Sequence, residues 1–343
     1  MSRRIVTPDD LDVVSPGRRD YWVSLPHDSI WGDWLIPLTV WVGPDAREGH
    51  GLVAFGSTHG DEYEGPVALK HLLRDIDGAT VTGRVVLVPV LSPPAFRAGR
   101  RESVGADGVN LNRAFVKEAG RDEALSGITH RIADFVRTSI WPHIHVVIDL
   151  HSGGDVARFA PLTSFHRVPD DRQAAAMLEM ARWFGVPFIL TYQDATPGLL
   201  TSDAERRGKI SVGGEFGWGG ALSPDGVRHA RHGVIAAAIL SGQMNLDVAP
   251  IAHHAAGTQR IVETVDPACY VLAPWPGHYE PLLECGSKVV KGEVVGLLHD
   301  FHRIDEDPWR VRAAVDGYLI AAAWHAQVQQ GQHIAVVAQC VPG

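Results

Sequence analysis

Short apolar runs alternate with longer amphipathic stretches between about residues 30 and 245, and this alternation constrains the fold more than any other feature. Each run is bounded by glycine or polar residues, as expected of a buried strand, and the stretches between them space their apolar residues as helices do. Strands joined by helices build layered α/β structures, so we predict a mixed sheet flanked by helices over residues 1–250. The strand-like runs are 52–55, 84–91, 144–150, 186–192 and 208–214, and the helix-like stretches are 62–75, 173–185 and 232–240.

The last quarter of the chain has a different pattern, with short β-like pieces separated by glycine. Residues 277–300 and 316–339 resemble each other, and both contain a Val-x-x-Gly segment, at 289–292 and at 328–331. Two copies of a hairpin-rich unit predict a small β-sandwich over residues 256–343, similar to the barrel-sandwich folds of lipoyl and biotinyl carriers. The tight-turn lysine that holds the cofactor in such carriers has no counterpart here. We therefore expect a structural or substrate-gating domain.

Charge and motif content limit the classes of ligand. The formal net charge of −9 disfavours binding to nucleic acid or to an anionic membrane, because both require a basic face. Neither of the glycine-rich phosphate signatures occurs at a strand-to-helix turn, so a nucleotide is not implied. The class of ligand that is left is a small molecule. The sequence is also compatible with a homo-oligomer.

The three cysteines indicate a reducing compartment. Cys269, Cys285 and Cys340 show no C-x-x-C spacing, which argues against a disulfide framework and against a cysteine-based metal site. The amino terminus lacks the apolar segment of a signal peptide, and no apolar run approaches the ~18 residues of a membrane span. We expect a cytoplasmic protein.

Two predicted strands deliver metal-binding side chains at their carboxyl ends. "VAFGSTHGDEYEG", residues 53–65, sets His59 and Glu62 three positions apart after an apolar run, and "VVIDLHSGG" ends in His151. Ligands of open α/β sheets bind in the crevice at these strand ends. Two imidazoles and one carboxylate with an open fourth position are the ligand set of a catalytic zinc ion. A single histidine is more often a surface or core residue, so the prediction rests on the three together.

Two further carboxylates lie at predicted strand ends. Asp149 stands two positions before His151, so both side chains share one face of a strand, and Asp149 is placed to orient the imidazole of His151. Its alternative role is to accept backbone hydrogen bonds at the strand end. Glu215 lies in the glycine-rich segment "ISVGGEFGWGG", where it is open to substrate. We predict that Glu215 is the general base of a metal-assisted hydrolysis, the alternative being a loop-ordering acid.

A fourth segment, "SPPAFRAGRRESVGADGVNLNRAF", follows the predicted strand 84–91. Its Asn112-Arg113 pair combines an amide with a guanidinium, which together suit a substrate carboxylate. Arg101 could neutralise the oxyanion that forms during attack on a carbonyl group. The alternative is ordinary loop chemistry with a surface arginine.

These motifs together resemble the succinylglutamate desuccinylase/aspartoacylase family, a branch of the zinc-carboxypeptidase-like hydrolases. The matching segments are "STHGDEYEG", "FRAGRRESVGADGVNLNRAF", "DLHSGG" and "GGEFG", in that order over residues 57–217, and they look closest to the N-acetyl-diaminobutyrate deacetylases. The resemblance implies one zinc ion held by His59, Glu62 and His151, with Glu215 as general base and acid. It also implies Arg101 for carbonyl polarisation and Asn112-Arg113 for the substrate carboxylate.

The sequence thus predicts an α/β zinc hydrolase of the carboxypeptidase-like fold that cleaves the amide bond of a small N-acyl amino acid. The motifs leave open whether the substrate is of the N-acetyl-diaminobutyrate type or of the succinylglutamate and aspartoacylase types. Within enzymes the rival is a metallocarboxypeptidase. Outside enzymes the rivals are a small-molecule binding protein that has lost turnover and a carrier built on the C-terminal domain.

Overall fold

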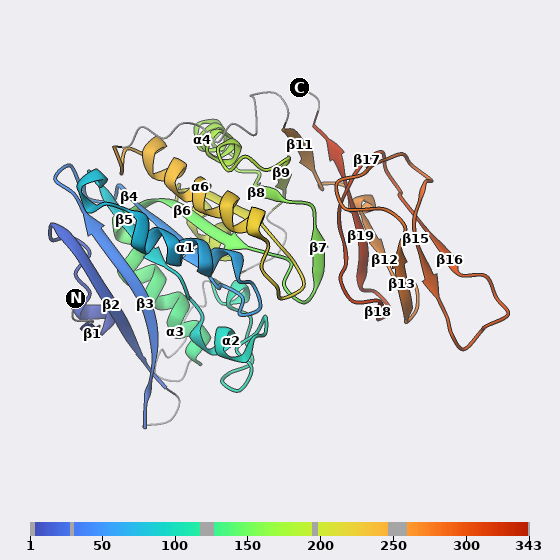
Figure 1. Ribbon diagram of the computed structural model, residues 1–343, viewed down its shortest axis with the longest axis horizontal. Coiled ribbons are helices and arrows are strands. Elements are labelled where there is room, and N and C mark those ends of the chain that lie inside the picture. The colour runs from blue at the N-terminus through green and yellow to red at the C-terminus, as the bar shows by residue number, and fades with distance from the viewer. Residues whose placement is uncertain (1–3, 28–30, 117–126, 194–197, 246–258, 342–343) are drawn as a thin grey trace.

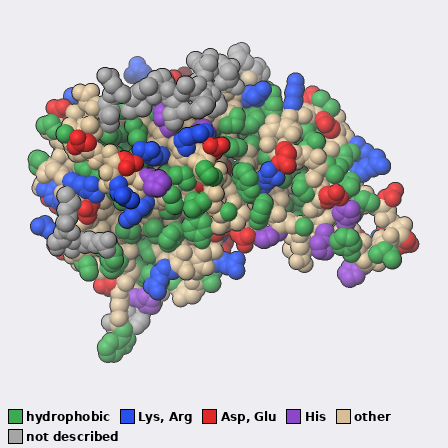
Figure 2. All heavy atoms as spheres, viewed as in Figure 1, with side chains coloured by type: hydrophobic (Ala, Val, Ile, Leu, Met, Phe, Trp, Pro, Cys, Tyr) green, Lys and Arg blue, Asp and Glu red, His purple; other side chains and the backbone are tan. Residues whose placement is uncertain are grey.

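The computed structural model of the chain describes residues 4–27, 31–116, 127–193, 198–245 and 259–341. Figure 1 shows an α/β body with a β-rich region at one side. No helix in these ranges is long and apolar enough to cross a membrane. Acidic and basic side chains are interspersed over the face shown in Figure 2.

A twisted mixed sheet forms the centre of the α/β body. Its middle strands β5, β4, β6 and β10 are parallel, and antiparallel strands continue it on both sides. Parallel strands buried on both faces require nearly continuous apolar sequence, which explains the short apolar runs. In spatial order the strands are β1 (Arg4–Val6), β2 (Gly17–Pro26), β3 (Asp33–Val42), β5 (Arg84–Val88), β4 (Gly51–Gly56), β6 (Ile144–His151), β10 (Ile210–Glu215), β8 (Leu162–His166) and β9 (Phe188–Tyr192).

Helices cover both faces of this sheet, as the alternation predicted. On one face α1 (Glu64–Asp75), α4 (Asp171–Arg182) and α6 (Pro224–Leu240) contribute to a single apolar core. On the other face α3 (Ile128–Phe135) and α5 (Leu200–Arg206) pack on the remaining sheet side chains. The short helix α2 (Pro93–Ala98) follows β5 and leads into the loop that carries Arg101.

The predicted elements agree with the structure except at their ends. In α1 the side chains of Leu69 and Leu72 are fully buried, whereas Val67 and Leu73 are half-buried. The run 84–91 forms a strand only as far as Val88, because Pro89 has no backbone N–H for the ladder. His151 and Glu215 are the last residues of β6 and β10, so Glu215 belongs to the strand and not to the glycine-rich loop after it.

The C-terminal region continues the central sheet. Strand β11 (Arg260–Glu263) pairs in parallel with β9 and antiparallel with β19 (His333–Cys340). β19 pairs with β17 (Gly317–Ala323) and with β12 (Tyr270–Leu272), and β17 pairs with β14 (Lys288–Val289). A second sheet, in the order β16 (Trp309–Arg312), β15 (Val294–His299), β13 (Gly277–Pro281) and β18 (Gln327–Val328), shares an apolar core with these strands.

The two sequence copies form equivalent units of a sandwich. Val289 and Val328 are both buried, and the following Gly292 and Gly331 both adopt positive φ, at 88° and 79°. The short strand of each copy pairs with the first strand of the other, since β14 joins β17 and β18 joins β13. The β-rich C-terminal fold is therefore confirmed. The predicted boundary between residues 250 and 256 lies outside the described residues and stays a prediction.

A candidate metal centre and its cavity

The parallel strands β4, β6 and β10 bring the predicted site residues to one edge of the sheet. Gly56 of β4 lies beside Leu150 of β6, and His151 lies beside Glu215 of β10. After β4 the chain turns sharply, with Ser57 at a φ of 53°. The turn continues through Gly60, where a Cβ atom would lie 2.0 Å from the carbonyl carbon of Ala95, so only glycine fits. This turn aims His59 and Glu62 back over the end of β6.

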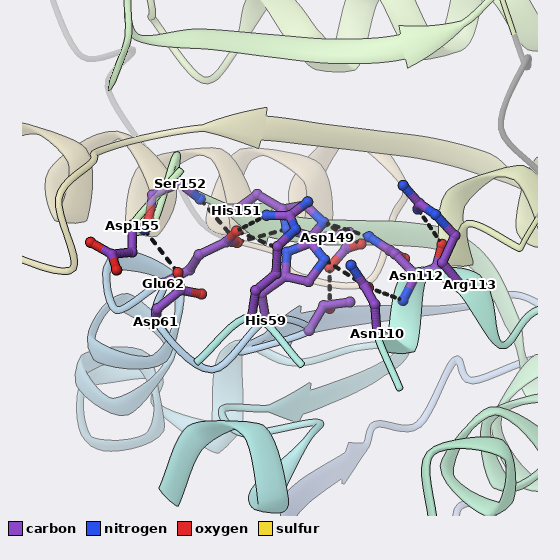
Figure 3. A network of polar contacts seen from close by, with 12 residues as sticks. His59, Asp61, Glu62, Asn110, Asn112, Arg113, Asp149, His151, Ser152 and Asp155 are labelled. Atoms are coloured by element: carbon purple, nitrogen blue, oxygen red, sulfur yellow. Dashed lines mark hydrogen bonds and ion pairs between the residues drawn. The ribbon is translucent and has the colours of Figure 1, made fainter. Parts of the chain in front are cut away.

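Glu62 is the centre of the cluster and is 1% exposed. Its Oε1 lies 2.8 Å from His59 Nδ1, and its Oε2 lies 2.8 Å from His151 Nδ1. The backbone N–H of Ser152 donates to Oε2 at 3.2 Å, and Arg101 Nη1 donates to Oε1 at 3.1 Å. Figure 3 shows both imidazoles turned toward this carboxylate. The three predicted ligands are thus in contact.

The far nitrogen of each imidazole faces an oxygen atom. His151 Nε2 is 2.7 Å from Asp149 Oδ2, and His59 Nε2 is 3.2 Å from the side-chain oxygen of Asn110. Asp149 is fully buried and accepts a further hydrogen bond, 2.7 Å long, from the hydroxyl of Thr58. An oxygen acceptor at Nε2 keeps the proton on that atom, which leaves the Nδ1 lone pair for a metal ion.

The charges within the cluster are strongly coupled. Burial alone would raise the pKa of Glu62, but His59 and His151 hold it well below its usual range. Burial alone would lower the pKa of His151, but Asp149 and Glu62 reverse this and hold it well above its usual range. Burial lowers the pKa of His59. The metal-free site therefore carries an ionised carboxylate beside one protonated and one neutral imidazole.

This donor set fits a divalent cation. One ligand atom from each of His59, Glu62 and His151 can be chosen so that all three lie within 4.8 Å of one another. Two imidazole nitrogens and one carboxylate oxygen are the protein ligands of catalytic zinc in several hydrolases, with the remaining position open. The proton on His151 is the group that a cation would displace, because metal ligands must be deprotonated.

Glu215 stands next to this cluster and lines the adjoining cavity. Burial raises the pKa of Glu215 to about 8, and the negative charge of Glu62 adds to the rise. Its Oε2 is buried and has no hydrogen-bond partner among the described residues. A carboxylate with a free oxygen and a pKa near neutrality is suited to accept and return a proton.

The predicted substrate-binding residues differ in their surroundings. The side chain of Arg101 lies on Glu62 and also borders the cavity. Arg113 borders the cavity too, and its pKa is lowered by burial and by the neighbouring Arg101. Asn112 is 6% exposed, and its side-chain oxygen accepts from the Leu200 N–H at 3.0 Å. The two guanidinium groups therefore face the cavity, whereas Asn112 is held inside the protein.

Three residues that contact this site were not among the predicted site residues. Asn110 meets His59, the backbone of Ser152 meets Glu62, and Thr58 meets Asp149. Asn110 lies in the same Asn-Leu-Asn-Arg segment as Asn112, and its side-chain oxygen also accepts from the Asn112 N–H at 2.8 Å. Its place in the segment that carries the predicted substrate-binding residues was the available signal.

A cavity of about 570 Å³ adjoins the candidate metal centre at Ser152 and Glu215 and extends toward the C-terminal region. β7 (Ala157–Phe159), which follows the His151 segment, pairs antiparallel with β17 and forms part of its wall. Residues of β17 and β19 also line the cavity. The C-terminal region is thus part of the cavity that adjoins the metal centre.

Comparisons with known proteins agree with this arrangement. Residues 48–240 match the succinylglutamate desuccinylase/aspartoacylase catalytic domain family. The N-alpha-acetyl-L-2,4-diaminobutyric acid deacetylase of Halomonas elongata is 33% identical over 341 residues, covering 96% of this chain and 94% of that protein. The product-bound ectoine utilization protein EutE (DoeB) of Ruegeria pomeroyi superposes with a TM-score of 0.86 at 30% identity, over 96% of this chain and 98% of the other. A succinylglutamate desuccinylase/aspartoacylase of Rhodobacter sphaeroides gives a TM-score of 0.88 at 28% identity, over 97% and 98%.

Proposed function

The chain belongs to the succinylglutamate desuccinylase/aspartoacylase family, as its motifs predicted, and from that premise we propose that it is a zinc-dependent deacylase acting on a small N-acyl amino acid. One observation carries the proposal. His59 and His151 turn their Nδ1 atoms to one buried carboxylate while oxygen acceptors hold their Nε2 atoms, and this cluster adjoins a cavity that contains Glu215. One zinc ion per chain suits this cluster.

Each residue of the site has a separate role in amide hydrolysis. The zinc ion, held by His59, Glu62 and His151, would supply a Lewis acid that makes water nucleophilic near neutral pH. Glu215 takes the proton of the attacking water and returns it to the leaving nitrogen, so that carboxylate and amine are released. Asp149 holds His151 in the tautomer and orientation that ligation requires.

The two arginines bind the substrate in this proposal. Arg113 forms a bidentate pair with the carboxylate of the N-acyl amino acid, which also relieves the repulsion between the neighbouring guanidinium groups of Arg113 and Arg101. Arg101 leaves Glu62 to stabilise the negative charge that develops on the carbonyl oxygen. Asn112 supports this wall by ordering Leu200. The free thiols of Cys269, Cys285 and Cys340 support a cytoplasmic location.

The experiment that tests the proposal combines metal analysis with substrate hydrolysis. The purified protein should bind one zinc ion per chain and release amine from at least one N-acetyl, N-succinyl or N-aspartyl amino acid. Peptides should be poor substrates, because residues of β17 and β19 line the cavity and narrow the space for a long chain. Faster release of carboxyl-terminal residues from peptides would establish a carboxypeptidase, and zinc binding without any hydrolysis would establish a binding protein.

A further inference from the structure

The cavity beside the metal centre is larger than an acetyl group and a short amino acid require. Its volume of about 570 Å³ lies within the ~300–1,000 Å³ of sites that enclose drug-sized ligands. Arg101, Arg113 and Glu215 border it at the metal centre. The remaining space extends between the α/β body and the C-terminal strands, and it is the nature of this extension that identifies the substrate.

The walls of the extension are apolar and come from both parts of the chain. The α/β body contributes Phe159 of β7, Leu162 of β8 and Leu190 of β9. The C-terminal strands contribute Ile320 of β17 and Val336 of β19. All five belong to, or pack against, one apolar cluster where the α/β body meets the C-terminal strands. Filling this space with a hydrocarbon group would remove apolar surface from water on both the ligand and the walls.

Charged groups are scarce along the same walls. Among the described residues that border the cavity, Glu215 is the only carboxylate, and the proposed reaction already employs it. Arg101 and Arg113 are likewise assigned to the carbonyl and to the carboxylate. The distant end offers Thr264, Tyr270, Gln332 and the exposed His333. A second charge on the substrate, of either sign, would therefore be buried without a dedicated partner, which is costly.

We propose, on the basis of the deacylase function above, that the space between the α/β body and the C-terminal strands is a specificity pocket for an N-acyl amino acid bearing an apolar group of about four to eight carbons. The apolar group is either the acyl chain or the amino-acid side chain, and the substrate panel below distinguishes the two. This substrate class differs from the cationic amino acid named in the Halomonas elongata relative.

A substrate panel on the zinc-loaded protein tests this proposal. N-acetylglycine is the reference, N-acetyl-leucine and N-acetyl-phenylalanine carry an apolar side chain, and N-hexanoylglycine carries an apolar acyl chain. N-acetyl-2,4-diaminobutyrate and N-acetylaspartate carry the opposite charges. At least one of the substrates with an apolar group should have a kcat/KM about tenfold or more above those of the reference and of both charged substrates. The substrate that does so shows whether the pocket takes the acyl chain or the amino-acid side chain. If the reference or a charged substrate is hydrolysed as fast as the substrates of both apolar kinds, the proposed specificity is wrong while the deacylase function stands. No hydrolysis of any compound would overturn both.

Matched variants connect the preference to the pocket. Leu190→Ala and Val336→Ala shorten its walls, and each should reduce the kcat/KM ratio of the preferred apolar substrate to N-acetylglycine by about fivefold. Leu73→Ala is the control, since Leu73 is a half-buried leucine of α1 that packs against a different core. The ratio does not depend on the fraction of folded protein. An unchanged ratio in both pocket variants would refute the assignment.

A binding measurement gives a readout that does not require turnover. Titration calorimetry of the metal-free protein should show that the preferred apolar compound binds more tightly than N-acetylglycine. Leu190→Ala should reduce this difference and Leu73→Ala should preserve it. Equal binding of both compounds to the unmodified protein would contradict an apolar pocket.

Discussion

Replacing Asp149 by asparagine should weaken metal binding without disturbing the fold. The carboxylate of Asp149 is fully buried, accepts the Nε2 proton of His151 at 2.7 Å and accepts the hydroxyl proton of Thr58 at 2.7 Å. An amide of the same shape can keep both contacts, because the Thr58 hydroxyl can also accept a hydrogen bond. The change therefore removes the negative charge and little else.

The magnitude follows from the loss of charge on one acceptor. A hydrogen bond to a charged group contributes about 1.5–3 kcal/mol and a neutral one about 0.5–1.5 kcal/mol. The hydrogen bond that holds the His151 imidazole is therefore weakened by roughly 1–2 kcal/mol. At about 1.4 kcal/mol for each factor of ten, the dissociation constant for zinc should rise roughly 5- to 30-fold. This lies within the range of about 10- to 100-fold measured for such supporting residues in other metal sites.

Competition against a chromophoric chelator measures this constant directly. Asp155→Asn is the matched control. Asp155 is a partly exposed carboxylate that pairs with Arg100 and His325 and not with His59 or His151. The control should bind zinc as the unmodified protein does. If Asp149→Asn binds zinc with unchanged affinity, Asp149 serves the strand end alone and the argument from its contact with His151 fails.

Four further variants and conditions test the remaining assignments. Glu215→Gln should keep its zinc and lose about 10²- to 10⁴-fold in kcat with little change in KM; retention of more than about a tenth of kcat would exclude Glu215 as the base. Arg113→Lys should weaken substrate binding by about 1–3 kcal/mol, because an ammonium cannot form the bidentate pair, and an unchanged KM would contradict that role. His151→Ala should lose zinc together with activity, which metal analysis of the purified variant decides. Zinc affinity should rise with pH by up to about tenfold per unit below the raised pKa of His151, because binding must displace its proton; affinity that is constant from about pH 6 to 8 would show that His151 is unprotonated in the metal-free site.

Local sequence pattern was enough to predict where the metal ligands meet. The apolar runs that become β4 and β6 identify parallel strands, and parallel strands present their carboxyl ends at one edge. His59 and Glu62 lie in the turn after β4 and His151 is the last residue of β6, so their convergence needed no knowledge of distant contacts. Asp149 was likewise placed by the two-residue period of a strand, and the structure puts its carboxylate on His151.

The contact of Asn110 with His59 could not be obtained in this way. The chain between α2 and Asn110 passes through Gly105 and Gly108, both with positive φ, and no periodic pattern specifies the path of such a loop. Asn110 is placed by this path and by its own hydrogen bond to the Asn112 N–H. The same limit applies to Arg101, whose contact with Glu62 depends on where the loop after α2 runs.

The pairing of the α/β body with the C-terminal strands could not be predicted from local sequence either, for a different reason. The two sequence copies predicted a sandwich, but nothing in them specifies that β11 pairs with β9 or that β7 pairs with β17. Such pairings between distant strands are selected by the apolar surface that they bury together, here around Leu162, Phe188 and Ile320. Deleting the C-terminal region would therefore expose the apolar edge of the α/β body and open the cavity at once. Only single substitutions such as Leu190→Ala can separate the contribution of this junction to substrate choice from its contribution to folding.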